Sequence, residues 1–169
     1  MTKQRPVRPL GYCSVLFAVA VLAASAIPAA ASDLAGRAQV VDGDTLEIAG
    51  QRIRLSGIDA PELDQTCTVL DRVWNCGREA MFALAFEIGT HWIACNERGR
   101  DRDGTVVAVC TAGPYDLAER MVRKGWALVD ENAADAAGYR AALRQARDFG
   151  SGLWRGGFIA PADWRRGKR

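Results

Sequence analysis

The stretch "VVDGDTLEIAGQRIRLSGIDAPE", residues 40–62, decides the fold class and contains five acidic residues. Apolar and polar residues alternate in "TLEIAG", so that Leu46 and Ile48 share one face, and "RIRLSGID" alternates in the same way. This period predicts two half-buried strands joined by a turn at "AGQ". With "RAQVVDG" before them, they indicate a meander that can curl into a barrel.

The rest of the chain predicts helices beside that barrel. "REAMFALAFEIG", "YDLAERMVRKG" and residues 135–149 have helical periodicity, whereas "HWIAC" and "TVVAVC" are typical of strands. Residues 61–76 are polar and are expected to form an irregular loop. This order of elements predicts an α+β domain, a five-stranded OB-fold β-barrel with three helices packed beside it. The expected buried faces are Met81, Leu84, Ala85 and Ile88 in the first helix, and Tyr139, Leu143, Ala146 and Phe149 in the third.

The N-terminus is typical of an export signal. Three basic residues precede the apolar run "CSVLFAVAVLAASAI", and small residues follow at Ala29–Ala31. This predicts a signal peptide over residues 1–31 that is cleaved near Ala31. A membrane anchor is the alternative, but the run is short for a spanning helix. The predicted product is an exported protein, periplasmic or extracellular, without stable membrane association, with one domain over residues 32–157 and a basic tail over 158–169.

Overall charge gives no support for nucleic-acid binding. The 169 residues include 22 basic and 20 acidic ones, and the first 31 contain three of the basic residues and no acidic one. The exported chain therefore has a net charge of about −1. Only local charge can favour a polyanion, and "WRRGKR" at the C-terminus is interpreted as a solvated end.

Four cysteines remain after signal cleavage, and an even number in an exported domain predicts disulfides with three possible pairings. Cys67–Cys76 and Cys95–Cys110 are favoured because each pair brackets one local loop. Zinc is the alternative, but the chain has no C-x-x-C motif and a single histidine, His91.

The acidic residues of the opening stretch are open to a structural interpretation, because "DGDT" is also typical of a plain turn. An EF-hand loop starting at Asp42 fails, since Leu46 and Glu47 stand where an oxygen ligand and a glycine are needed. In a meander, however, Asp44 at the start of one strand and Asp59 at the end of another come together. Two carboxylates at one barrel end suit a hard cation.

Nearby Arg54 and Glu62 complete a set suited to phosphodiester hydrolysis. A guanidinium stabilises the charge of the transition state, and a carboxylate orients or deprotonates water.

These motifs resemble the thermonuclease (staphylococcal nuclease-like) family. The resemblance rests on "VDGDTLEI", "RIRLSGIDAPE", "RDRDGTVVAVC", "ERMVRKGWALV" and "ARDFGSGLW", and it covers about residues 35–154. Exported four-cysteine members of similar sequence are associated with succinoglycan (exopolysaccharide) biosynthesis. The resemblance implies an OB-fold barrel with three helices that hydrolyses DNA and RNA with Ca²⁺.

The resemblance also implies roles for individual residues. Asp44, Asp59 and the backbone carbonyl of Ala60 would bind Ca²⁺, and Asp42 would support them. Glu62 would act as general base or position the water, and Arg54 would contact the phosphate.

Two positions depart from the family pattern. The family carries a second catalytic arginine in D-x-Y-G-R, but "DRDGT" ends here in Thr105 and has Asp103 for the tyrosine. Arg100 or Arg102 would be the neighbouring arginines available to compensate, although solvated hairpin arginines are the favoured interpretation. "LVDENAAD" also lacks the family's tyrosines.

Two hypotheses follow for this chain. The first is a Ca²⁺-dependent, monomeric nuclease with reduced activity. The second is a near-inactive OB-fold binding module with an envelope or exopolysaccharide-related role.

Overall fold

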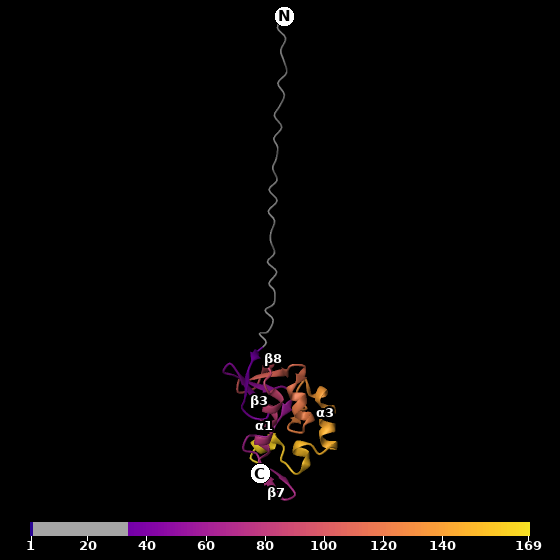
Figure 1. Ribbon diagram of the computed structural model, residues 1–169. Coiled ribbons are helices and arrows are strands. Elements are labelled where there is room, and N and C mark those ends of the chain that lie inside the picture. Colours follow the sequence, from indigo (N-terminus) through magenta and orange to yellow (C-terminus); the bar gives the residue numbers. More distant parts are fainter. Residues whose placement is uncertain (2–33) are drawn as a thin grey trace.

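Figure 1 shows the computed structural model of the chain, which describes Met1 and residues 34–169. The signal peptide predicted over residues 1–31 therefore lies, apart from Met1, outside the described residues. Five segments build the main sheet: Leu34–Gly36 (β1) with Ala38–Val40 (β2), Thr45–Ile48 (β3), Gln51–Leu55 (β4), Ile93–Arg100 (β8) and Val106–Ala112 (β9).

The sheet closes through the first of these segments. Its strand order is β1-β8-β9-β4-β3-β2, with β4 and β9 parallel and the other neighbours antiparallel. Only Arg37 separates β1 from β2, so one continuous segment pairs with β8 at one end of the order and with β3 at the other. The predicted α+β fold with a five-segment barrel is confirmed.

The barrel interior follows the predicted alternation. Leu46, Ile48, Ile53 and Leu55 are buried, whereas Arg52 and Arg54 between them are exposed. Each such aliphatic side chain contributes roughly 1.5–3 kcal/mol on burial. The alternation thus places every second residue of β4 on the outer surface of the barrel, where Arg54 is available to a ligand.

The predicted helices are present as Cys76–Ile88 (α1), Leu117–Arg123 (α2) and Ala136–Asp148 (α3), and they pack on one core with the barrel. Asp116 caps α2 by accepting a hydrogen bond from Glu119 N at 3.1 Å. Two face predictions are wrong. Ala85 is exposed because the buried face of α1 runs along Ala80, Leu84 and Ile88. Phe149 is 77% exposed, because α3 ends before it and Gly150 turns the chain away.

The segment predicted as an irregular loop contains a hairpin. Cys67–Val69 (β6) pairs with Arg72–Trp74 (β7), and the two turn residues Leu70 and Asp71 both have positive φ. Such a turn ordinarily uses Asn-Gly or Asp-Gly, so "LD" gave no turn signal. A disulfide joins Cys67 to Cys76, and a second joins Cys95 to Cys110 across β8 and β9.

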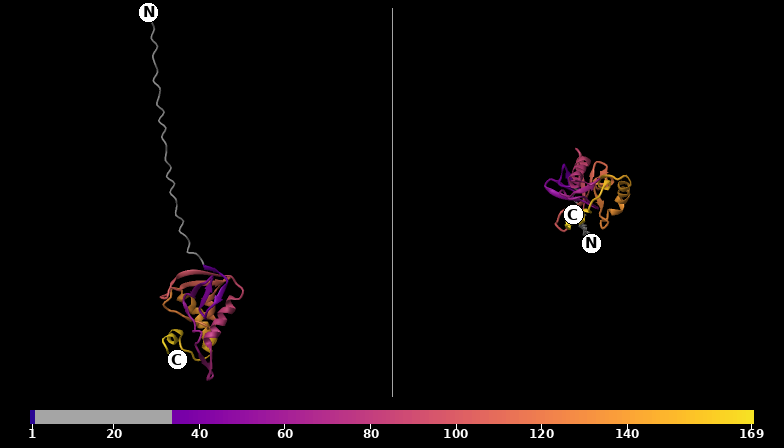
Figure 2. Two further views of the ribbon diagram at one scale, coloured as in Figure 1. Left: turned by 90° about the vertical axis from the view of Figure 1, so that its left-hand side faces the viewer. Right: turned by 90° about the horizontal axis from the view of Figure 1, so that it is seen from below.

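The C-terminal segment, defined here as residues 157–169, is folded, which corrects its interpretation as a solvated end. It contains the helix Pro161–Arg165 (α4), which follows the 3-10 turn Gly152–Arg155 (η1). Trp164 is only 8% exposed, and burial of its indole contributes to fixing this short helix. The C-terminal segment, yellow in Figures 1 and 2, lies at the end of the molecule nearer β7 and away from β8. The domain boundary at residue 157 stays a prediction.

Three short strands complete the fold. Tyr115–Asp116 (β10) pairs with β9, and Leu128–Val129 (β11) pairs with Ile58–Asp59 (β5). In the part of the chain that the structure describes, no helix is both long enough and apolar enough to cross a membrane.

Candidate active site

The turn between β2 and β3 supplies the first acidic residues of the site. Asp42 Oδ1 accepts a hydrogen bond from Asp44 N at 3.0 Å, and Asp44 O accepts one from Leu55 N at 2.8 Å. The glycine between them is required by space, because a Cβ on Gly43 would lie 2.8 Å from the Cβ atoms of both Ala60 and Ala80. The turn is therefore pressed against the segment after β5 and against α1.

Asp44 is the most buried carboxylate of the site, at 8% exposure. Its Oδ2 accepts a hydrogen bond from Ala60 N at 2.8 Å, and its Oδ1 accepts one from Thr45 Oγ1 at 3.0 Å. Burial, followed by the negative charges of Asp42 and Asp59, raises the pKa of Asp44 to about 7. The site thus concentrates negative charge that a cation would relieve.

The oxygen donors of the site fit Ca²⁺ chemically. Among residues 34–169, no group of three or more His, Cys, Asp or Glu side chains is arranged to hold a metal ion. The predicted set of protein ligands is smaller and consists of two carboxylates and the Ala60 carbonyl. Ca²⁺ takes about six to eight oxygen ligands, so water or substrate would supply the others. Asp44 and Asp59 are the residues that would hold the ion by their side chains.

Glu62 lies on the loop after β5, at the side of Asp59. A buried glutamine fixes the backbone of this loop: Gln65 N donates to Glu62 O at 2.8 Å, and Glu62 N donates to Gln65 Oε1 at 3.2 Å. The Glu62 carboxylate is free of that backbone network and accepts a hydrogen bond from Arg165 Nη1 at 2.6 Å. Glu62 is thus positioned by its main chain, while its carboxylate faces the site.

Arg54 projects from β4, where it pairs with Thr45 of β3 and Val107 of β9. Its Nη1 lies 3.8 Å from Asp101 Oδ2. Asp101 also organises the β8–β9 turn, because its Oδ1 accepts from Thr105 N at 2.9 Å and from Asp103 N at 3.0 Å. Thr105 is thereby brought beside Arg54.

Two neighbouring cavities collect these residues. A cavity of about 200 Å³ is lined by Asp42, Asp44, Thr45, Arg52, Arg54, Glu62, Asp101, Thr105 and Arg165. A second, of about 350 Å³, is lined by Arg54, Ile58, Asp59, Leu128, Val129, Asp130, Glu131, Asn132, Ala160, Ala162 and Arg165. The structure therefore brings the predicted carboxylates and Arg54 together across two adjoining hollows, whose shared residues are the two arginines.

The compensating arginines named from sequence lie elsewhere. Arg100 Nη1 donates to Gly104 O at 3.0 Å, so this side chain closes its own turn. Arg102 is exposed on the same turn, and neither side chain lines the two cavities. Both positions are consistent with structural hairpin arginines.

Arg165 is a site residue that the sequence did not predict. Its Nη1 donates to Asp59 Oδ1 at 2.8 Å and to Glu62 Oε1 at 2.6 Å, which places a C-terminal guanidinium among the predicted site residues. "APADW" held a signal for a folded segment, since proline favours the first position of a helix and tryptophan favours burial. Nothing in "WRRGKR" indicated which arginine would reach the site.

A barrel of this topology with acidic and guanidinium groups at one end defines a nuclease-like class of domain. The family model described as "Staphylococcal nuclease homologue" matches residues 52–156, and the chain belongs to this family. It is also 38% identical over 154 residues to the "Succinoglycan biosynthesis protein ExoI" of Rhizobium meliloti (strain 1021). That similarity covers 86% of this chain and 79% of the relative.

Proposed function

We propose that this chain is an exported, Ca²⁺-dependent phosphodiesterase that hydrolyses DNA or RNA. The observation that carries the proposal is the shared cavity, in which the Asp44 and Glu62 carboxylates face Arg54. Ca²⁺, held by Asp44, Asp59 and the Ala60 carbonyl, would supply Lewis-acid stabilisation of negative charge on the phosphate. The two disulfides are consistent with an oxidising compartment outside the cytoplasm.

The protein side chains divide the chemistry between them. Glu62 orients a water molecule and accepts its proton as the water oxygen bonds to phosphorus. The phosphorus–oxygen ester bond then breaks, and the leaving oxygen takes a proton from solvent. Arg54 donates hydrogen bonds to the non-bridging oxygens, whose charge grows in the transition state.

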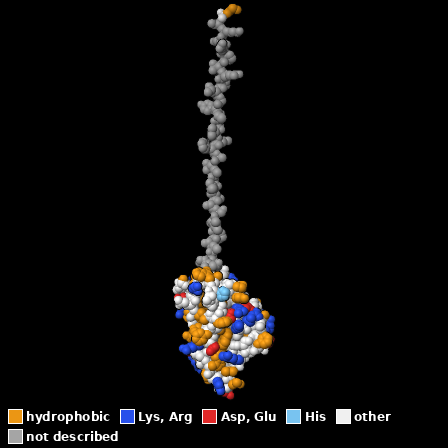
Figure 3. Space-filling view, in the orientation of Figure 1, with side chains coloured by type: hydrophobic (Ala, Val, Ile, Leu, Met, Phe, Trp, Pro, Cys, Tyr) orange, Lys and Arg blue, Asp and Glu red, His pale blue; other side chains and the backbone are white. Residues whose placement is uncertain are grey.

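The distribution of charge gives only limited support to nucleic-acid binding. Figure 3 shows Lys and Arg side chains in several separate groups over one face of the molecule, with the largest group at its right-hand edge and hydrophobic or uncharged surface between the groups. The larger cavity combines an apolar floor that includes Ile58 and Val129 with the acidic Asp130 and Glu131. Weak ground-state binding of a polyanion is the expected consequence.

The second candidate is an OB-fold binding module with little turnover and an exopolysaccharide-related role. It is favoured by Thr105, which lines the cavity where the resemblance implies an arginine, and by the acidic rim of the larger cavity. The printed name of the ExoI relative is consistent with such a role. Loss of one positioned donor lowers kcat by ~10²–10³ and leaves a slow enzyme.

The deciding experiment uses purified residues 32–169 and denatured DNA, with Ca²⁺ or with a chelator. Calcium-dependent degradation that Glu62→Gln lowers by at least ~10²-fold supports the enzyme. Glu79→Gln, on the exposed side of α1, is the matched control and is expected to degrade DNA at the wild-type rate. Ca²⁺ binding without any degradation would reject the enzyme in favour of the binding module. Size-exclusion chromatography of the same sample tests the proposed monomer.

A further inference from the structure

Arg165 occupies a position that an ordinary tail residue would not reach. The same Nη1 atom donates to Asp59 and to Glu62, which are the proposed metal ligand and the proposed base. Arg165 also lines both cavities, and Arg54 is the other residue that the two cavities share. Arg54 from β4 and Arg165 from α4 therefore face both cavities where a phosphate would lie, whereas Arg52 of β4 lines only the smaller one.

The other cations of the C-terminus are directed elsewhere. Arg166 is paired with Asp163, and Lys168 Nζ lies 3.0 Å from Asp163 Oδ2. The guanidinium of Arg169 stacks on the Trp164 ring, 4.0 Å from its centroid. Placement of Arg165 in the site is thus specific and does not reflect a general attraction of a basic tail to an acidic cavity.

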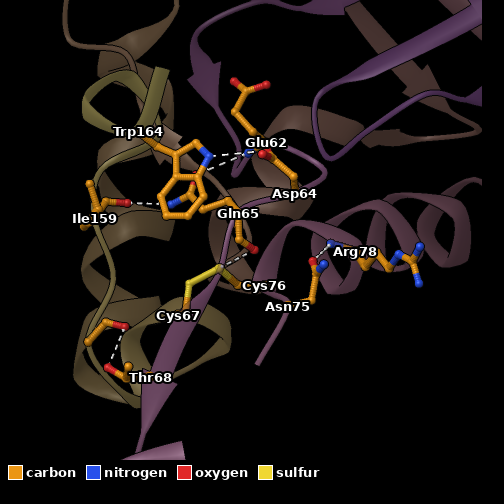
Figure 4. Close-up of a disulfide and its surroundings, with 11 residues drawn as sticks. Glu62, Asp64, Gln65, Cys67, Thr68, Asn75, Cys76, Arg78, Ile159 and Trp164 are labelled. Atoms are coloured by element: carbon orange, nitrogen blue, oxygen red, sulfur yellow. Dashed lines mark hydrogen bonds between the residues drawn. A yellow bond between two sulfur atoms is a disulfide. The ribbon is translucent and has the colours of Figure 1, made fainter. Parts of the chain in front are cut away.

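The C-terminal segment is anchored to the loop that carries Glu62. Gln65, fully buried, donates from Nε2 to Ile159 O at 2.7 Å, and Trp164 Nε1 donates to Asp64 Oδ1 at 3.3 Å (Figure 4). Thr68 and Gly157 exchange two backbone hydrogen bonds, at 2.8 and 2.9 Å. These anchors hold α4 in place, whereas the Arg165 side chain itself remains 45% exposed.

We propose that Arg165 is a second phosphate-binding catalytic residue, contributed by the C-terminal segment; this inference rests on the proposed nuclease function. Exposed ion pairs are weak, so the guanidinium can leave the carboxylates when a cation neutralises Asp59. It then donates to a non-bridging phosphate oxygen in the cavities that it lines together with Arg54. Arginine suits this role because its planar fork matches the geometry of phosphate oxygens.

The first test measures kcat on single-stranded DNA at saturating Ca²⁺. Arg165→Ala is expected to lower kcat by ~10²–10³-fold. Arg165→Lys is expected to recover part of this loss, because lysine restores the positive charge but not the paired hydrogen bonds of a planar guanidinium. Arg166→Ala is the matched control and is expected to stay within about twofold of wild type. An unchanged rate in Arg165→Ala would reduce the residue to a structural ion pair. A raised rate would instead identify it as an inhibitory latch, and either result overturns the proposal.

The second test does not depend on turnover. In the Glu62→Gln background, Arg165→Ala is expected to weaken Ca²⁺-dependent binding of a single-stranded oligodeoxynucleotide about tenfold and to reduce the slope of log affinity against log salt by ~0.7. If the wild type binds the oligonucleotide but does not cleave it, the proposed nuclease function is rejected. The salt dependence of binding still tests whether Arg165 contacts a phosphate. An unchanged slope, or no oligonucleotide binding by any variant, overturns the inference.

Discussion

Two guanidinium groups face the same cavities, but the chain places them by different means. Arg54 sits in the hydrogen-bonded ladder of the barrel, opposite Thr45 on one side and Val107 on the other. Arg165 lies outside any sheet, on a five-residue helix that side-chain contacts fix to the loop carrying Glu62. The family model also ends at residue 156, so it includes Arg54 and leaves Arg165 beyond its limit.

The two positions are encoded by different features of the sequence. A ladder residue is placed by a repeat of period two, which local sequence specifies. An anchored residue is placed by contacts between positions about one hundred residues apart, such as Asp64 with Trp164. The barrel therefore presents the proposed phosphate-binding Arg54 through its fold, while the proposed second phosphate-binding arginine, Arg165, requires a segment that lies outside the barrel.

The largest expected effect comes from releasing the C-terminal segment while leaving the barrel intact. Gln65→Leu keeps the size of this buried side chain but leaves Glu62 N and Ile159 O without their partners. Each unpaired group costs about 1–3 kcal/mol when buried, and both bonds here are only partly buried, so urea unfolding is expected to show a loss of about 2–4 kcal/mol. In the folded protein, kcat is expected to fall as far as in Arg165→Ala.

Gln51→Leu is the control, because Gln51 Nε2 donates to Arg52 O at an exposed turn. Its stability is expected to change by less than about 0.5 kcal/mol. Wild-type kcat in Gln65→Leu would contradict the view that anchoring of α4 positions Arg165.

Local pattern was sufficient to predict most of the fold. The alternation in β3 and β4 predicted the barrel core, and Asp116 with Glu119 predicted the start of α2, because these signals arise within a few residues. The β6–β7 hairpin was missed because Leu70 rarely adopts positive φ and the turn has no glycine after Asp71. Its geometry is imposed by the surrounding structure, which includes the Cys67–Cys76 bond and the contact of Thr68 with Gly157.

The candidate site could be predicted only for residues on the barrel strands or on the turns between them. Asp44 and Arg54 are brought together by the β3–β4 register, and that register follows from the sequence pattern. The partner of Asp59 and Glu62 could not be inferred, because Arg165 and Arg166 are adjacent arginines of equal propensity. Burial of Trp164 determines the rotation of α4, and with it which arginine faces the site.

A smaller effect is expected from adding a guanidinium to the barrel. Thr105 lines the cavity beside Arg54, so Thr105→Arg is expected to raise kcat on DNA about tenfold in the wild type. The gain is expected to approach ~10²-fold in Arg165→Ala, because the new arginine then replaces a missing donor. A double-mutant cycle measured by kcat quantifies the overlap between the two arginines.

Thr111→Arg, on β9 but outside both cavities, controls for added positive charge and is expected to leave kcat unchanged. Equal gains from Thr105→Arg with and without Arg165 would show that the two positions act independently. If Thr105→Arg has no effect and Arg102→Ala abolishes activity, the neighbouring hairpin arginine is the compensating residue instead.

The smallest expected effect is on stability, and it differs between the two proposed metal ligands because only Asp59 is paired with an arginine. Asp59 has the Arg165 guanidinium at 2.8 Å, whereas Asp44 is buried and has a pKa raised to about 7. Between about pH 4 and pH 7, the folded protein keeps a proton on Asp44 that the unfolded chain releases, so stability falls as pH rises. In chelator at pH 8, Asp44→Asn is expected to stabilise the protein by roughly 1–2 kcal/mol, and this gain should disappear below about pH 4.

Thermal unfolding from pH 4 to pH 8, with chelator and with Ca²⁺, measures this difference. Asp59→Asn is the comparison and is expected to give no stabilisation, because it removes an ion pair rather than an unrelieved charge. Ca²⁺ is expected to raise the melting temperature of the wild type and to have little effect on Asp44→Asn, since a ligand that binds only the folded state stabilises it. Equal stabilisation by both substitutions would mean that Arg165 does not neutralise Asp59, and that the charge of the C-terminal segment has no effect at the metal ligands.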